Sequence, residues 1–231
     1  MKINILYLPE WAKQAKWLTV IIDVFRAFST ECYIFANGAK SIIPVWKLDI
    51  AYKLKRENTG FILVWERWGE KPDGFDYGNS PSKVEFVNFT WKTIIHTTSS
   101  GTQGIANATH ANEIITGSFT NAQAIVDYIR QQSPKYVSLI AMWSWWKRIT
   151  DEDKLCAEYI KNTLEGKPTD FWKIVKYLRN YKEAEKFFDD TLERAPERDF
   201  ELCLSLNKFN FVLKAKPYKD GEIFLKKIEM A

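Results

Sequence analysis

The sequence predicts a three-layer α/β/α fold, in which helices cover both faces of a mostly parallel sheet; a partly mixed sheet is the alternative. The apolar runs are short and continuous rather than alternating, which is typical of strands buried on both faces. Segments with helical spacing separate these runs through about residue 165. The length of 231 residues suits one sizeable domain, so we expect residues 1–231 to form a single unit.

The expected strands are the runs richest in Val, Ile and Leu. Residues 18–25 read LTVIIDVF, and residues 136–142 read YVSLIAM. The six runs of this kind are residues 18–25, 41–45, 61–65, 92–97, 113–117 and 136–142. Residues 2–8 (KINILYL) form a weaker candidate, and residues 209–214 (FNFVLK) are predicted to close an edge of the sheet.

The expected helices lie between these runs, at residues 29–37, 48–57, 119–132 and 151–164. Ser118 and Thr150 precede the last two and are good N-caps, because a side-chain oxygen there can accept from a free backbone N–H. Residues 169–206 read as two or three charged helices that follow Gly166-Lys167-Pro168. Without a flexible linker, we expect the helix-rich segment 167–206 to pack on the same core.

Composition excludes several classes of protein. With 46% hydrophobic and 27% charged residues, the chain is not disordered, and its net charge of +4 is too small and too dispersed for a nucleic-acid-binding protein. Three widely spaced cysteines suggest a reducing compartment. No apolar run approaches 18 residues, and the N-terminus lacks a signal-peptide core. We therefore expect a cytoplasmic protein without a membrane partner.

Polar side chains directly follow several predicted strands. Asp23 and Arg26 follow residues 18–22, and Glu66 and Arg67 follow residues 61–65. In open α/β sheets, ligands bind beyond the carboxyl ends of the strands, so these positions are candidates for a site.

The acidic residues suggest a metal. Burying Asp23 unpaired at the end of LTVII would be costly, although an ion pair with Arg26 is the structural alternative. Carboxylate oxygens are the hard ligands that magnesium requires. The acids on successive strand ends predict a Mg²⁺ site formed by Asp23, Glu66, Asp76 and Asp153.

The segment Thr97–Thr102 (TTSSGT) is a candidate anion site, because small hydroxyl residues around Gly101 let backbone N–H groups approach an anion. An ordinary capped turn is the alternative, since no Lys follows Gly101 as in a Walker motif. The only histidines are His96 and His110, so neither a zinc site nor a Ser-His-Asp triad is expected. The substrate-binding candidates are Asn79, Ser80, Thr97, Thr98, Ser99, Gly101, Thr102, Ser118 and Asn121.

These segments resemble the 2-phosphosulfolactate phosphatase family. The resemblance covers most of residues 18–160 and extends faintly to residues 201–215. The motifs are VIIDVFRAFST (20–30), ANGAKSIIPV (36–45), ER-x-GEK-x-x-GFDYGNSP (66–81), KTIIHTTSSGT (92–102), ITGSFTNAQAIVDYI (115–129) and DEDKLCAEYI (151–160). The resemblance implies magnesium-dependent hydrolysis of the phosphate ester of 3-sulfolactate, in sulfonate metabolism that includes coenzyme M synthesis in some organisms.

The residue pattern fits that chemistry. Asp23 and Glu66, with Asp76 or Asp153, would hold magnesium, the Thr97–Thr102 segment would cradle an anion, and Arg26 and Arg67 would offset negative charge in the transition state. The attacking group is left open between metal-bound water and an enzyme side chain such as Asp23 or Cys156. The expected partner is a small anionic phosphorylated substrate, and a homodimer is left open.

The chain departs from the family at several glycines. It has 10 Trp and 10 Gly, and family glycine positions carry Trp65, Trp68, Trp91, Trp143, Trp145 and Trp146. Trp is no routine substitute for Gly, because it disfavours positive φ and fills space. Three explanations compete: a Trp-lined cleft that binds a nucleotide, sugar or partner without catalysis; an inactive relative; or a gene that reads UGA as glycine, translated with UGA as tryptophan. We favour the third, and UGG codons at these positions would exclude it.

Overall fold

The computed structural model describes residues 1–7, 9–65, 72–98, 101–144 and 148–230. Strands and helices alternate along most of this range, and the sheet is mostly parallel with an antiparallel insertion. The predicted α/β fold is therefore confirmed. No helix in the described part of the chain is long and apolar enough to cross a membrane.

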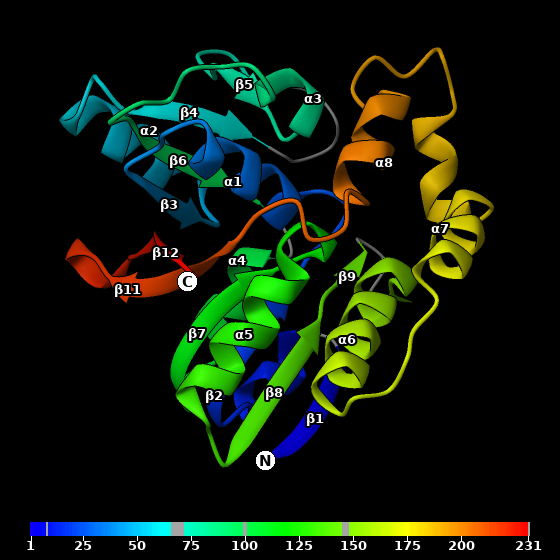
Figure 1. Cartoon of the computed structure of the whole chain (residues 1–231). Coiled ribbons are helices and arrows are strands. Elements are labelled where there is room, and N and C mark those ends of the chain that lie inside the picture. The colour runs from blue at the N-terminus through cyan, green and yellow to red at the C-terminus, as the bar shows by residue number, and fades with distance from the viewer. Residues whose placement is uncertain (8, 66–71, 99–100, 145–147, 231) are drawn as a thin grey trace.

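Ten strands form one sheet in the order β1-β8-β2-β7-β11-β12-β3-β6-β4-β5 (Figure 1). In that order the strands are β1 (Lys2–Tyr7), β8 (Tyr136–Ala141), β2 (Trp17–Ile22), β7 (Ala111–Gly117), β11 (Phe211–Pro217), β12 (Ile223–Glu229), β3 (Ser41–Val45), β6 (Thr93–Thr97), β4 (Ile62–Trp65) and β5 (Tyr77–Gly78). Two short strands, β9 (Trp143–Ser144) and β10 (Arg148–Ile149), form a separate antiparallel ribbon.

The sheet consists of two parallel halves joined by an antiparallel hairpin. Strands β1, β8, β2 and β7 form one half, and β3, β6, β4 and β5 form the other. The hairpin meets β7 only at Leu213 and Lys214, and it meets β3 only at Leu225. Three successive antiparallel pairings, β7 with β11, β11 with β12 and β12 with β3, thus separate the two parallel halves (Figure 1).

The prediction that residues 209–214 close an edge is wrong. Strand β11 lies inside the sheet, since it pairs along all seven of its residues with β12 and also with β7. The sequence IFLKKIE of β12 was not predicted as a strand, because its two adjacent lysines interrupt the apolar run. Without β12, β11 has one fewer neighbour and reads as an edge.

Helices pack on both faces, as expected of three layers. The helices are α1 (Ala27–Ala36), α2 (Leu48–Glu57), α3 (Pro81–Val84), α4 (Gly101–Asn107), α5 (Ala122–Gln132), α6 (Asp151–Leu164), α7 (Phe171–Arg179) and α8 (Glu197–Cys203), with 3-10 turns η1 (Pro9–Gln14), η2 (Phe119–Asn121), η3 (Lys182–Phe187) and η4 (Lys219–Gly221). On β2, Val20 and Ile22 face α5 and α6, whereas Ile21 faces α1 and α4. Helix α2 covers the second half of the sheet on the face opposite α1.

The C-terminal helices share the main core. Ile174 and Leu178 of α7, Phe187 of η3 and Phe200 of α8 belong to the same buried cluster as β2 and α5. Figure 1 shows α8 between α3 and α7, above the ends of the strands. These helices are therefore placed to supply side chains to a site at those ends.

Two exposed tryptophans adopt a backbone conformation typical of glycine. Trp91 has φ 62° and its side chain is 81% exposed, and Trp17 also has φ 62°. Trp91 precedes β6, so it lies at the amino end of that strand and not in a loop at the carboxyl ends. Trp65, in contrast, is buried and packs edge-on against Phe75. The backbone thus supports glycine at Trp91 and adds Trp17 as a second such position.

We predict that Trp91→Gly stabilises the chain. Left-handed backbone costs a non-glycine residue about 1 kcal/mol, and the exposed indole has little packing to lose. Trp172→Gly is the matched control, because Trp172 is 79% exposed but lies within helix α7. Urea unfolding should give a higher midpoint for Trp91→Gly and a lower one for Trp172→Gly; a destabilised Trp91→Gly would contradict the assignment.

Candidate active site

Asp23 lies directly beyond the carboxyl end of β2. Its backbone N–H donates to the carbonyl of Gly117 on β7 (3.2 Å), which continues the strand pairing to the sheet edge. Its Oδ1 accepts from the backbone N–H of Ala27 (3.2 Å), the first residue of α1. A carboxylate at a helix N-terminus interacts favourably with the unpaired N–H groups there. Asp23 is only 6% exposed, so its charge is held in a poorly solvated position.

The first turn of α6 brings a second carboxylate to this place. Asp153 Oδ1 accepts from the backbone N–H of Val24 (2.7 Å), and its Oδ2 accepts from Thr150 Oγ1 (2.8 Å). Thr150 precedes α6 as predicted, but its hydroxyl donates to Asp153 instead of capping the helix. Asp153 therefore ties α6 to the turn that carries Asp23.

Glu152 completes a buried acidic cluster, which we define as Asp23, Glu152 and Asp153. Glu152 is 4% exposed, and its Oε2 has no hydrogen-bond partner among the described residues. Burial, with the nearby charge of Asp23, raises the pKa of Glu152 to about 7. Burial and the charges of Glu152 and Asp23 raise the pKa of Asp153 as well. Glu152 was not among the predicted ligands, because the sequence gives no local sign that an acid beside Asp153 is buried.

Arg26 lies at the N-terminus of α1, next to the acidic cluster in sequence. Its Nη1 donates to Asp199 Oδ2 (2.7 Å) and to the carbonyl of Arg194 (2.6 Å). Its ion pair is thus with Asp199, and not with Asp23 as the structural alternative proposed. The Arg26 residue is 7% exposed. A buried guanidinium beside buried carboxylates is a suitable site for an anionic substrate.

Ser80 and Asn79 come from the other half of the sheet. Ser80 Oγ donates to Asp199 Oδ1 (2.8 Å), so the same carboxylate contacts Arg26 and Ser80. Asn79 is buried, and its backbone N–H donates to the carbonyl of Trp65 at the end of β4 (2.8 Å). Asp199 was also not predicted as a site residue. Its signal is an acid on the buried face of a helix, three and four residues before Leu202 and Cys203.

The hydroxyls of Thr97, Thr98 and Thr102 form hydrogen bonds within the protein, and Ser99 and Ser100 between them lie outside the described residues. Thr98 Oγ1 accepts from the backbone N–H of Thr102 (3.1 Å) and lies 2.7 Å from Thr102 Oγ1. Thr97 is fully buried, and its hydroxyl donates to the carbonyl of Val64 (3.4 Å). A Cβ on Gly101 would lie 2.7 Å from the ring of Phe28, so glycine is required there for packing. The bonds of Thr98 and Thr102 agree with the capped turn that is the alternative, and the anion cradle stays a prediction.

Ser118 and Asn121 form a capping box at the start of η2. Ser118 Oγ accepts from the backbone N–H of Thr120 (3.3 Å), and Asn121 Oδ1 accepts from that of Ser118 (3.1 Å). Asn121 Nδ2 donates to the carbonyl of Phe211 (3.3 Å). Both residues are fully buried, and these hydrogen bonds give each of them a structural role at the start of η2.

Asp76 stands apart from the acidic cluster. Its Oδ2 accepts from the backbone N–H of Leu63 (2.8 Å), two residues before the end of β4, and lies 3.7 Å from Lys55 Nζ. The structure therefore connects Asp23 with Asp153 through the turn at Val24, and Arg26 with Ser80 through Asp199, whereas the contacts of Asp76 described above are with Leu63 and Lys55. Three further predicted residues, Glu66, Arg67 and Ser99, lie outside the described residues.

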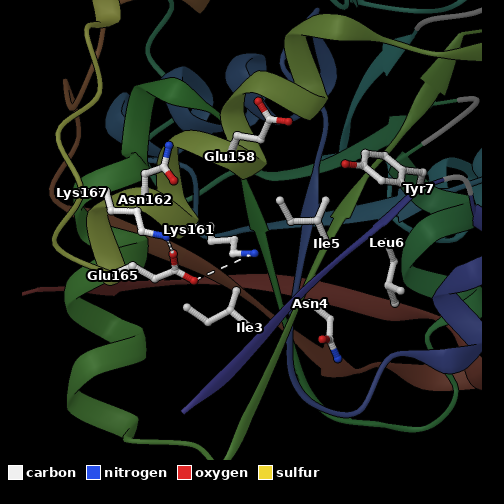
Figure 2. Close-up of a pocket in the computed structure, with 10 residues that line it drawn as sticks. All are labelled: Ile3, Asn4, Ile5, Leu6, Tyr7, Glu158, Lys161, Asn162, Glu165 and Lys167. Carbon is white, nitrogen blue, oxygen red and sulfur yellow. Dashed lines mark hydrogen bonds and ion pairs between the residues drawn. The ribbon is translucent and has the colours of Figure 1, made fainter.

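A groove of about 610 Å³ lies elsewhere, between edge strand β1 and helix α6 (Figure 2). Figure 2 shows Glu165 of its wall in ion pairs with Lys161 and Lys167. None of the predicted site residues lines this groove. It is thus separate from the candidate site.

Buried carboxylates and an arginine at the strand ends of a covered sheet are suited to hydrolysis of a phosphate ester. Comparison with known proteins identifies the family. The family model for 2-phosphosulpholactate phosphatase matches residues 7–217. The chain therefore belongs to the 2-phosphosulfolactate phosphatase family, a family of phosphoric monoester hydrolases, and the resemblance read from its motifs is confirmed.

Relatives in distant organisms cover most of the chain. A probable 2-phosphosulfolactate phosphatase of Bacillus subtilis is 30% identical over 209 residues, which are 89% of this chain and 89% of the relative. A protein of the same name from Thermoplasma acidophilum is 32% identical over 214 residues, 93% and 90% of the two chains. One from Caldicellulosiruptor saccharolyticus is 33% identical over 210 residues, 80% and 86% of the two chains.

We predict that Glu152→Gln stabilises the metal-free protein above pH 7. The folded pKa of about 7 exceeds the ordinary 4.5, so the folded chain holds the proton more tightly than the unfolded chain does. Stability is then lost as pH rises from about 4.5 to 7, by an amount on the order of 1–3 kcal/mol. Thermal unfolding with EDTA should show a higher melting temperature at pH 8 for Glu152→Gln than for wild type.

Glu158→Gln of the same helix is the control, because Glu158 is only half-buried, and it should change the melting temperature little. A lower melting temperature for Glu152→Gln at pH 8 would mean that the Glu152 carboxylate is already compensated in the metal-free protein.

Proposed function

We propose that the protein hydrolyses the phosphate ester of 2-phospho-3-sulfolactate, or of a similar small α-hydroxy acid, to the free hydroxy acid and inorganic phosphate. Membership of the family and the names of the relatives support this substrate class. The observation that carries the proposal is the acidic cluster at the strand ends with buried Arg26 beside it. Such a site combines negative charge for a cation with positive charge for an anion.

The proposed substrate explains the need for opposite charges. It carries phosphate, carboxylate and sulfonate on three carbons, so binding requires compensation of several negative charges. Arg26 supplies one buried positive charge. The half-buried Lys186 of η3 supplies a second positive charge, which acts on Glu152. Its Nζ lies 5.0 Å from the centre of the Phe187 ring, and the guanidinium of Arg26 faces the same ring. We propose that these two cations orient the acid groups of the substrate.

Magnesium fits the acidic cluster in charge and in donor type. The described residues contain no group of three His, Cys, Asp or Glu side chains placed to hold a metal ion, and Glu66 lies outside them. The unpartnered Glu152 Oε2 and the raised pKa values of Glu152 and Asp153 support a site at which negative charge lacks full compensation. Asp23 and Glu152 would hold the ion, with Asp153 beside them and Glu66 as a further ligand. When bound, magnesium would polarise the phosphoryl oxygens.

Cys156 does not fit the role of attacking group. It is fully buried, and burial together with the charge of Asp153 raises the pKa of its thiol well above the ordinary value. A buried thiol of this kind is not a nucleophile. In the proposed reaction a water oxygen bonds to phosphorus, the bond from phosphorus to the ester oxygen breaks, and the ester oxygen takes up the proton that the water loses. If Asp23 attacks instead, an aspartyl phosphate forms as the ester bond breaks, and a second step in which water hydrolyses it releases inorganic phosphate.

We also propose, from the sequence, that the protein is located in the cytoplasm and does not bind nucleic acid. Whether the protein forms a homodimer is also left open, and light scattering would measure its oligomeric state.

We predict that Asp23→Asn lowers kcat/KM for phosphate release from 2-phosphosulfolactate by about 100-fold or more, because it removes a charge at the reacting centre. Asp76→Asn is the matched control, since that carboxylate is bound at Leu63 and should leave kcat/KM within about twofold. Malachite-green assays with magnesium or EDTA measure both, on the chain as written and on a variant with Gly at the six doubtful Trp positions.

Three results would contradict the proposal. The first is that neither chain releases phosphate from phosphosulfolactate or phospholactate. The second is that EDTA leaves the rate unchanged, which would exclude magnesium. The third is that Asp23→Asn and Asp76→Asn behave alike.

A further inference from the structure

The candidate site draws residues from both halves of the sheet. Arg26 follows β2 in the first half, and Ser80 follows β5 in the second half. The halves are joined through the β11–β12 hairpin, which pairs with β3 only at Ile42, three residues before the end of that strand. Hydrogen bonds of the sheet therefore do little to fix the two groups of strand ends relative to each other.

One buried carboxylate connects these two groups. Asp199 on α8 is fully buried, and its Oδ2 accepts from Arg26 Nη1 (2.7 Å). Its Oδ1 accepts from Ser80 Oγ (2.8 Å) and from the backbone N–H of Ser82 (2.9 Å). A carboxylate that accepts three hydrogen bonds from two segments holds those segments at a fixed separation.

The contact also orients the guanidinium of Arg26. Nη1 is used twice, by Asp199 and by the carbonyl of Arg194, so the guanidinium is anchored on that side by the segment around α8. Nε is buried and has no hydrogen-bond partner within the described part of the chain. A guanidinium has five N–H donors, and leaving one buried and unpaired is unfavourable until an acceptor arrives. An anionic substrate would supply that acceptor.

We propose that Asp199 is a positioning residue for the reaction. It holds Arg26 of one half of the sheet at a fixed distance from Ser80 and Ser82 of the other half, so that the anionic substrate binds between them. This inference rests on the proposed function and adds to it: the C-terminal helical segment, which follows the strand–helix repeat, completes the site.

Asp199→Asn separates these contacts while keeping the side-chain shape. An amide offers one acceptor oxygen and one NH₂ donor. If its oxygen faces Ser80 and Ser82, its NH₂ faces the Nη1 donor of Arg26. If its oxygen faces Arg26, its NH₂ faces the N–H of Ser82, which also donates. In either orientation one of the two segments loses its acceptor.

The test compares Asp199→Asn, Arg26→Ala and the double variant in full-length protein, with Asp190→Asn as the control. Asp190 is an exposed acid that precedes the same helix. We expect Asp199→Asn to lower kcat/KM for phosphosulfolactate at least tenfold and to raise KM, whereas Asp190→Asn stays within twofold. The double variant should be no worse than Arg26→Ala, because without the guanidinium the amide oxygen at position 199 can accept from Ser80 and Ser82. Losses that multiply in the double variant, or an Asp199→Asn enzyme within twofold of wild type, would overturn the proposal.

Ser80→Ala provides a second test that leaves the buried ion pair intact, in case Asp199→Asn does not fold. It removes one contact from the second half of the sheet and should raise KM at least threefold with an unchanged melting temperature. An unchanged KM would contradict the connection between the halves. Calorimetric titration with inorganic phosphate separates this proposal from the proposed function: even without turnover, Asp199→Asn should weaken phosphate binding at least tenfold, and equal binding would overturn the positioning role.

Discussion

Burial of negative charge at the carboxyl ends of the strands is the constraint on which the site depends. Asp23, Glu152 and Asp153 come from two elements that are distant in sequence, and the bond from the Val24 N–H to Asp153 joins them. Three carboxylates in a poorly solvated place repel one another, so their full ionisation requires positive charge from outside the cluster. In the proposed function, a magnesium ion and the cationic side chains of Arg26 and Lys186 would supply that charge.

The strands of the sheet that positions this cluster are paired over very different lengths. Within each half, parallel strands pair over four to six residues, except that the short β5 pairs with β4 over two, and the hairpin that joins the halves pairs with each of them at only one or two residues. Side-chain contacts above the strand ends must therefore complete the arrangement. The Asp199 contacts with Arg26 and Ser80 are the clearest of these, and they explain why helices that add nothing to the sheet belong to the same core.

Much of the fold was accessible from sequence because buried strands leave a strong local signal. The runs that form β2, β3, β6 and β8 were found from their Val and Ile content alone. The amphipathic β12 was missed, since its lysines look like those of an exposed loop. For the site, the sequence pointed to Asp23, Arg26, Ser80 and Asp153 through their places after strands. It could not reveal Glu152 or Asp199, whose burial depends on the docking of α6 and α8. It also included Asp76, because spacing does not show that this carboxylate turns back to β4.

The tryptophans separate into different physical cases. Trp91 and Trp17 sit in a backbone conformation that glycine adopts without cost, whereas Trp65 fills a place in the core beside Phe75. Trp91 also lies away from the strand ends, so the structure gives no support there to a Trp-lined binding cleft. An unusual reading of UGA remains our favoured explanation for the equal numbers of Trp and Gly.

The account is tested most directly by anomalous diffraction from crystals grown with Mn²⁺ and inorganic phosphate. It predicts one manganese peak bounded by Asp23 and Glu152, with phosphate between the ion and Arg26. A peak elsewhere, or none at saturating manganese, would contradict the claim that the buried acids form a cation site for phosphate-ester hydrolysis.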